Sequence, residues 1–169
     1  MTLSWAFEDE ATALSDQVLK RLEATHAVTP ALWAFEVASV LTAAERRGRI
    51  NAVQQAEFLD RLRRLPVAIE HRPAAWLCQQ ILPLARTTGL SAYDAAYLEL
   101  AVREGMPLAT LDDDLEKAAR TVGVPPRRSP AVSIRGFCPA SGVCPIAGLE
   151  LIIASARGAS RGRRRRRTP

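Results

Sequence analysis

"LSAYDAAYLELAVREGMPLATLDDDLEKAA", residues 90–119, combines two helix starts with one short apolar run. Ser91 and Asp94 give the spacing S-x-x-D, typical of a capped helix start, and apolar residues follow at helical spacing. The run "PLATL" (107–111) predicts a buried strand, and Asp112 at its carboxyl end can cap the next helix. A helix, a strand and a helix in this order indicate a parallel sheet with helices on its faces.

The chain upstream of this stretch continues the same alternation. Thr29 is expected to cap a helix with Pro30 at its first position, and Asn51 is expected to cap the next helix. The remaining helices are predicted over 8–24, 31–47, 52–65 and 73–89, and the remaining strands over 26–29 and 67–71. The predicted fold class is therefore α/β, with a three-layer arrangement of helices on both faces of a parallel sheet. Ligands of such sheets bind beyond the carboxyl ends of the strands, where Asp112 lies.

Apolar spacing and cysteine usage give further expectations. Trp33, Leu41 and the apolar residues between them recur at helical spacing and are expected to face the core. Cys78 lies among apolar neighbours and is expected in the core as well. With Cys138 and Cys144 it makes an odd, sparse set without zinc-like spacing, which excludes a disulfide framework and a zinc site.

The net charge of +5 is unevenly distributed along the 169 residues. Residues 1–120 hold 13 Lys or Arg and 17 Asp or Glu, a net charge of −4, whereas residues 121–169 hold 10 Arg and one Glu, a net charge of +9. The body therefore carries no overall charge that would attract nucleic acid. No apolar run is long enough for a membrane span and no secretory signal is evident, so a cytoplasmic protein without membrane contact is expected.

The composition changes after Gly123, and two segments are predicted on this basis. Residues 1–124 form the folded domain, and residues 125–169 form a tail rich in Pro, Gly and Arg, with one apolar island at 149–156. Such a composition predicts disorder for most of the tail. The tail is interpreted as an appendage or as the product of a shifted reading frame, and alternatively as an Arg-rich arm that binds RNA phosphates.

Three acids are the candidate functional residues. Asp94 and Asp112 can each be explained as a helix cap, because an acid in a first helical turn favours the helix dipole. Glu36 lies close to the apolar stripe of its predicted helix, where a carboxylate is costly unless it is paired. Three carboxylates from separate helix or strand ends could hold Mg²⁺ or Mn²⁺, which prefer oxygen ligands and activate water for phosphodiester cleavage.

Two segments together resemble a known family. "TPALWAFEVASVLTAAERRGRI" (29–50) and "LSAYDAAYLELAVREGMPLATLDDDLEKAARTVGV" (90–124) are similar to PIN-domain ribonucleases, in particular VapC-type toxins of bacterial toxin–antitoxin pairs, and the resemblance spans residues 2–124. It implies a Mg²⁺-dependent endoribonuclease that acts on RNA, binds an antitoxin protein and often forms a homodimer. It also implies acids gathered at the carboxyl ends of parallel strands.

The resemblance assigns the site residue by residue. The conserved Glu of the family falls on Glu36 within "FEVAS", the Asp of its "YDA" on Asp94, and the Asp of its "TLD" on Asp112. These three are the expected catalytic and metal-binding residues. Ser39 stands where the family usually has Asn, so a polar contact made there is weaker or different. Asp113 and Asp114 are expected to be solvated acids of a first helical turn.

The resemblance also implies a feature that the front of the chain lacks. The family opens with a central apolar strand whose final Asp is a main metal ligand and precedes a Trp by about seven positions. Because the Trp here is Trp5, that Asp would lie before Met1. We therefore expect the first central strand to be missing, through a late start or a truncated gene, and we expect an impaired nuclease.

Other functions stay open at this stage. The main alternative is a non-catalytic protein that binds a basic partner through its acidic body or nucleic acid through its Arg-rich tail. A DNase or phosphatase is a further alternative, because carboxylate–Mg²⁺ sites serve many phosphoryl reactions. His26 and His71 stand at the ends of predicted strands and are not placed as general bases.

Overall fold

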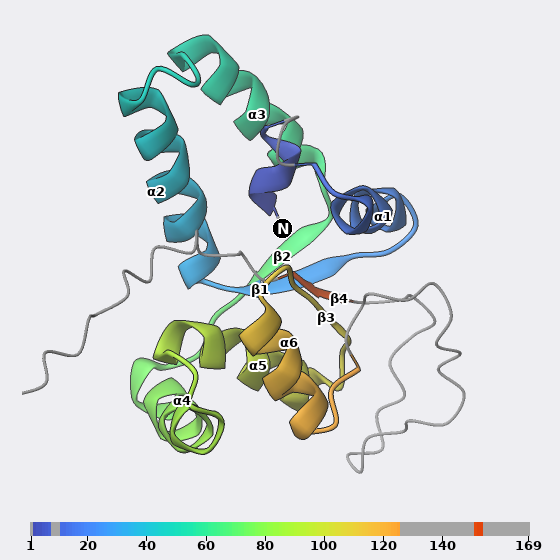
Figure 1. Cartoon of the computed structure of the whole chain (residues 1–169), viewed down its shortest axis with the longest axis vertical. Helices are drawn as coiled ribbons and strands as arrows, with labels where there is room; N and C mark the ends of the chain where they lie inside the picture. The colour runs from blue at the N-terminus through green and yellow to red at the C-terminus, as the bar shows by residue number, and fades with distance from the viewer. Residues whose placement is uncertain (1, 8–10, 126–150, 154–169) are drawn as a thin grey trace, which may run out of the picture.

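The computed structural model describes residues 2–7, 11–125 and 151–153, which form helices on both sides of a small sheet (Figure 1). One side carries the 3₁₀ helix η1 (Thr2–Trp5) with α1 (Ala13–Leu22), α2 (Leu32–Arg46) and α3 (Ala52–Arg64). The other side carries α4 (Ala74–Thr88), α5 (Ala92–Glu104) and α6 (Asp113–Thr121). The predicted α/β fold with three layers is therefore confirmed.

The sheet has four described strands in the order β2-β1-β4-β3, all parallel. Their bounds are β1 Ala27–Pro30, β2 Val67–Glu70, β3 Leu108–Ala109 and β4 Leu151–Ile153. The three strands predicted from the sequence are thus present. The fourth lies in the segment expected to be disordered, and it occupies an inner position between β1 and β3. Residues 126–150 and 154–169, with both tail cysteines and the Arg-rich end, lie outside the described residues, so disorder for most of the tail stays a prediction.

Local chemistry sets most helix ends where the sequence predicted them. Asn51 and Gln54 form a reciprocal capping box at the start of α3. The Ser91 side chain accepts from the backbone N–H of Asp94 at the start of α5, and Gly105 ends that helix with a φ of 63°. A left-handed backbone at this position favours glycine, because it has no Cβ to clash.

Thr29 does not cap a helix, which corrects the prediction. It lies in β1 and is fully buried, and the next residue, Pro30, pairs with Glu70 of β2. Helix α2 begins two residues later at Leu32, with no side-chain cap on Ala31. Pairing with β2 decides the conformation, because an apolar run beside a parallel partner gains more from the ladder than from one cap.

The core surrounds α5, in which every residue from Ala95 to Ala101 is buried. Trp33 and Leu41 belong to this core as predicted. Cys78 does not, since it is exposed on α4, a helix with no fully buried residue. The inward stripe of α4 runs through Leu77 and its helical neighbours, so the adjacent position of Cys78 turns outward. No described helix is long and apolar enough to cross a membrane.

Candidate functional site

Glu36 and Asp94 lie on the same side of α5. The hydroxyl of Tyr97 donates a hydrogen bond of 2.6 Å to Oε2 of Glu36, across 61 positions of sequence. Tyr97 follows Asp94 by three residues, so the two side chains project from the same face of α5. Sequence reasoning missed this contact, although a buried tyrosine usually needs a partner for its hydroxyl, which indicates a nearby acceptor.

Asp94 and Asp112 both act as helix-start residues in the structure. Oδ2 of Asp94 accepts a 2.5 Å hydrogen bond from the hydroxyl of Ser91. Asp112 follows β3 and accepts from the backbone N–H of Leu115 at 2.9 Å, while its own N–H donates to Oγ1 of the buried Thr110 at 3.0 Å. The capping interpretation is therefore confirmed for Asp112, whereas the cap of α5 is Ser91 and Asp94 is an acid of its first turn. It does not exclude metal binding, because a carboxylate has about four acceptor positions.

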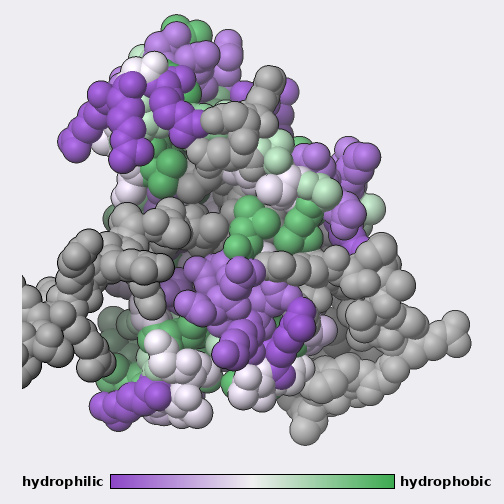
Figure 2. Space-filling model, viewed as in Figure 1, coloured by the Kyte–Doolittle hydropathy of each residue, from purple (hydrophilic) through white to green (hydrophobic). Residues whose placement is uncertain are grey.

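The outer face of α6 is strongly hydrophilic (Figure 2). Asp113 and Asp114 are exposed there, as expected for solvated acids in a first helical turn. Among the residues that the structure describes, no three His, Cys, Asp or Glu side chains gather closely enough to hold a metal ion. The shared metal of Glu36, Asp94 and Asp112 therefore stays a prediction.

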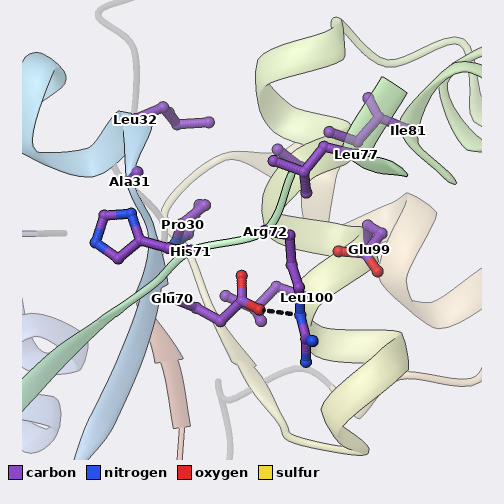
Figure 3. Close-up of a pocket in the computed structure, with 11 residues that line it drawn as sticks. Pro30, Ala31, Leu32, Glu70, His71, Arg72, Leu77, Ile81, Glu99 and Leu100 are labelled. Carbon is purple, nitrogen blue, oxygen red and sulfur yellow. Dashed lines mark hydrogen bonds and ion pairs between the residues drawn. The ribbon is translucent and has the colours of Figure 1, made fainter. Parts of the chain in front are cut away.

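A pocket of about 150 Å³ opens at the carboxyl ends of β1 and β2 (Figure 3). Its walls include Pro30 from β1, Leu77 from α4 and Leu100 from α5, and Glu70 and Glu99 lie at its polar side. Glu36, Asp94 and Asp112 do not line it. A pocket therefore lies at the carboxyl ends of the strands, as the sequence analysis expected for a ligand site. It is, however, on the face of α5 opposite to Asp94.

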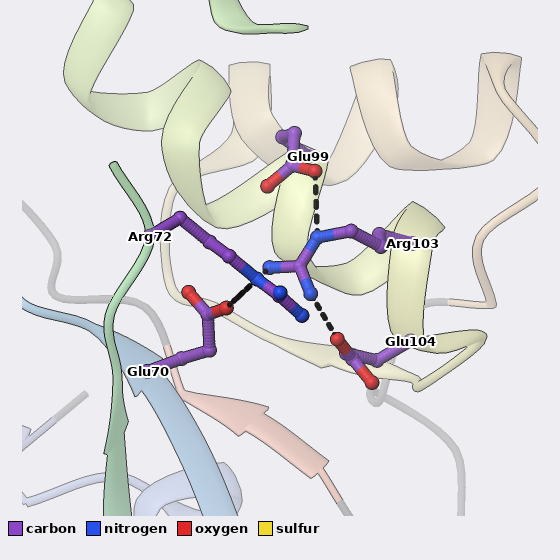
Figure 4. Close-up of polar contacts among 5 residues, drawn as sticks. All are labelled: Glu70, Arg72, Glu99, Arg103 and Glu104. Atoms are coloured by element: carbon purple, nitrogen blue, oxygen red, sulfur yellow. Dashed lines mark hydrogen bonds and ion pairs between the residues drawn. The ribbon is translucent and has the colours of Figure 1, made fainter. Parts of the chain in front are cut away.

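Arg103 joins three carboxylates beside this pocket (Figure 4). Its Nε donates to Oε1 of Glu99 at 2.9 Å, its Nη1 pairs with Glu104, and its Nη2 lies 3.2 Å from Oε1 of Glu70. Nη2 makes no hydrogen bond to the described residues, so its contact with Glu70 is an ion pair alone. Arg72 also pairs with Glu70, at 2.7 Å. Sequence reasoning missed this cluster, although the acid of "YLELA" in an otherwise apolar helix was a signal for it.

Burial disfavours the charge on Arg103, but the hydrogen bond and negative charge of Glu99, aided by Glu70 and Glu104, outweigh it. The pKa of Arg103 is therefore raised above its usual value, and the guanidinium stays charged at every working pH. Arg103 and Arg72 also lie over the ring of Trp76, at 5.4 and 5.7 Å from its centroid. The cluster thus ties the end of β2 to α5 and α4.

The capping role of Asp112 can be tested by substitution. We expect Asp112→Ala to lower the free energy of unfolding by about 1 kcal/mol, because the first-turn N–H of Leu115 loses its acceptor. Asp112→Asn should cost less than about 0.5 kcal/mol, because Asn caps a helix as well as Asp does. Urea unfolding of both variants measures the difference, and equal losses would contradict the capping role.

Comparison with known proteins places the chain in a family. The model of the family described as "PIN domain" matches residues 2–121, from η1 to the end of α6. The chain is also 29% identical over 107 residues to the protein named Ribonuclease VapC3 of Pyrobaculum aerophilum, an alignment that covers 63% of this chain and 80% of that protein. The PIN domain match contains Glu36, Asp94 and Asp112 and covers well over half of the sequence. The chain therefore belongs to the PIN domain family.

Proposed function

We propose that the chain is a VapC-like toxin that cleaves RNA with the help of a divalent metal ion. Its membership of the PIN domain family and its similarity to a ribonuclease VapC3 support a phosphodiester hydrolase. The observation that carries the proposal is the Tyr97–Glu36 hydrogen bond, which holds one candidate carboxylate on the face of α5 from which Asp94 projects. Two acids far apart in sequence are thereby brought to one side of the same helix.

The donor atoms suit the expected ion, but their arrangement is incomplete. Carboxylate oxygens are the ligands that Mg²⁺ and Mn²⁺ prefer. Glu36, Asp94 and Asp112 each accept at least one hydrogen bond from the protein, which fixes their positions. No group of three such side chains gathers within the described residues. We therefore propose that the chain as printed binds the ion weakly and is a slow nuclease.

The partners follow from the same proposal. An RNA strand is the substrate and an antitoxin protein is the regulator, as the similarity to a VapC protein supports. We include a second copy of the chain as a further partner, to be tested by light scattering of the purified protein. A cytoplasmic location fits an enzyme of this kind, because its RNA substrate is there.

A cleavage assay with excess protein over a mixed RNA pool tests the function. We expect slow cleavage that needs Mg²⁺ or Mn²⁺, stops with a chelator, and falls at least about tenfold in Asp94→Asn and Glu36→Gln. Glu36→Gln is the sharper variant, since the amide oxygen still accepts the hydrogen bond from Tyr97 while the ligand charge is removed. Asp60→Asn is the matched control, because Asp60 is an exposed acid paired only with Arg63 among the described residues.

The outcomes separate the parts of the proposal. Rapid cleavage would overturn the impairment, and metal-independent cleavage would overturn the role of the metal ion. A folded protein that binds RNA without cutting it, and loses binding when residues 157–169 are deleted, would favour a binding protein with an Arg-rich tail instead.

A further inference from the structure

We propose that residues 151–153 fill a gap for one strand between β1 and β3, here called the strand-acceptor slot. We further propose that the fold depends on this strand. β4 runs parallel to both neighbours: Ile152 pairs with Val28 on one side and with Leu108 on the other. The PIN domain match ends at residue 121, so this inner strand comes from outside the matched region. The slot thus accepts a parallel strand, and residues 151–153 of the tail fill it.

An empty slot would destabilise the fold, because backbone groups would be left unpaired. Ala109 of β3 is fully buried beside β4, so loss of β4 would leave backbone groups unpaired on the facing edges of β1 and β3. Among the described residues, β3 reaches the sheet only through β4. Loss of β4 would therefore detach β3, and with it the segment that carries Asp112 from the strand to α6.

The length of the chain allows the insertion. Residues 126–150 separate Pro125 from β4, and 25 residues can span up to roughly 85 Å when extended. A domain of about 150 residues has a radius of gyration near 15 Å, so the connection is several times longer than needed. Longer loops cost little extra entropy, since the cost grows only with the logarithm of length. Nothing in the length prevents the tail from reaching the centre of its own sheet.

β4 supplies the strand without an acid. The family resemblance placed a strand ending in a metal-binding Asp at the centre of the sheet, whereas residues 151–169 contain neither Asp nor Glu. Strand pairing and metal binding are therefore separated in this chain: β4 restores the first and leaves the second to Glu36, Asp94 and Asp112. The inference concerns the fold, so it stands or falls independently of RNA cleavage.

Proline at position 152 tests the proposal in the full-length chain. Proline lacks the backbone N–H and cannot sit within an inner strand, so Ile152→Pro should break the ladder on both sides of β4. We expect hydrogen exchange at Val28 and Ala109 to become at least about 100-fold faster, with a lower melting temperature or loss of the folded protein.

Two controls make the test specific. Ile152→Val keeps the N–H and a β-branched side chain and should leave the exchange rates within about threefold. Ser141→Pro puts the same residue into the stretch between α6 and β4 and should also leave them unchanged. Failure of only Ile152→Pro to fold would support the slot. A folded Ile152→Pro protein in which Val28 and Ala109 exchange as slowly as in the parent would overturn it.

Discussion

Arg103→Met should lower the free energy of unfolding by about 3 kcal/mol, because it leaves the carboxylate of Glu99 buried without its cation. The side chains of Arg103 and Glu99 are only 19% and 9% exposed, so water cannot take over the lost ion pair. Methionine keeps an unbranched apolar chain near the ring of Trp76, and the substitution therefore removes mainly the charge. Urea unfolding with an unchanged m-value measures the loss.

Arg72→Met is the matched control for this prediction. Arg72 pairs with the same Glu70 and lies over the same Trp76 ring, but its side chain is 49% exposed. An exposed pair contributes less than about 1 kcal/mol, so this variant should stay close to the parent. The double variant Arg103→Met/Glu99→Gln should recover part of the loss, because the unpaired charge is gone. Equal effects of Arg103→Met and Arg72→Met would show that burial does not set the strength of the cluster.

The stabilisation by Arg103 should not depend on pH between about 6 and 9. The pKa of this group is raised in the folded state, so its contribution is complete at every pH below the pKa of the unfolded state. It is lost only as the pH rises through the still higher folded value. Any loss of stability within the working range must therefore come from other groups.

Local signals explain why much of the fold could be predicted from the sequence. The starts of α3, α5 and α6 follow from the short polar side chains of Asn51, Ser91 and Asp112, each of which accepts from the N–H three residues further along the chain. The burial of Trp33 and Leu41 follows from helical spacing alone. Such features need no knowledge of distant parts of the chain.

The features that the sequence did not reveal depend on contacts between distant segments. β4 became a strand because two buried strand edges accept it, whereas its surroundings in the sequence have the composition of a disordered tail. Thr29 was drawn into β1 by its pairing with β2. The same holds for the site: the positions of Glu36, Asp94 and Asp112 in their elements were predicted, but the Tyr97–Glu36 hydrogen bond and the Arg103–Glu70 ion pair join residues that no local pattern connects.

Leu98→Ala should lower the free energy of unfolding by about 3–5 kcal/mol, since it opens a cavity at the centre of the molecule. Leu98 is 0% exposed and lies midway along the buried part of α5, which packs against β1, β4 and both neighbouring helices. Its neighbours one turn away on the same face are Ala95 and Ala101, which have no flexible side chains to fill the space. The cavity therefore cannot collapse easily, and the loss should lie in the upper part of the usual range. Thermal and urea unfolding both measure it.

Two variants decide whether the cavity is the cause. Leu59→Ala makes the same chemical change at a side chain of α3 that is 48% exposed, and should cost less than about 1 kcal/mol. Leu98→Met nearly conserves the volume and should cost less than about 1.5 kcal/mol. A loss in Leu98→Ala no larger than in Leu59→Ala would mean that α5 is not the centre of the core. The expected ranking instead makes α5 the rigid support of Asp94 and Tyr97, so Leu98→Ala should also weaken the proposed binding of a divalent ion, whereas Leu98→Met should not.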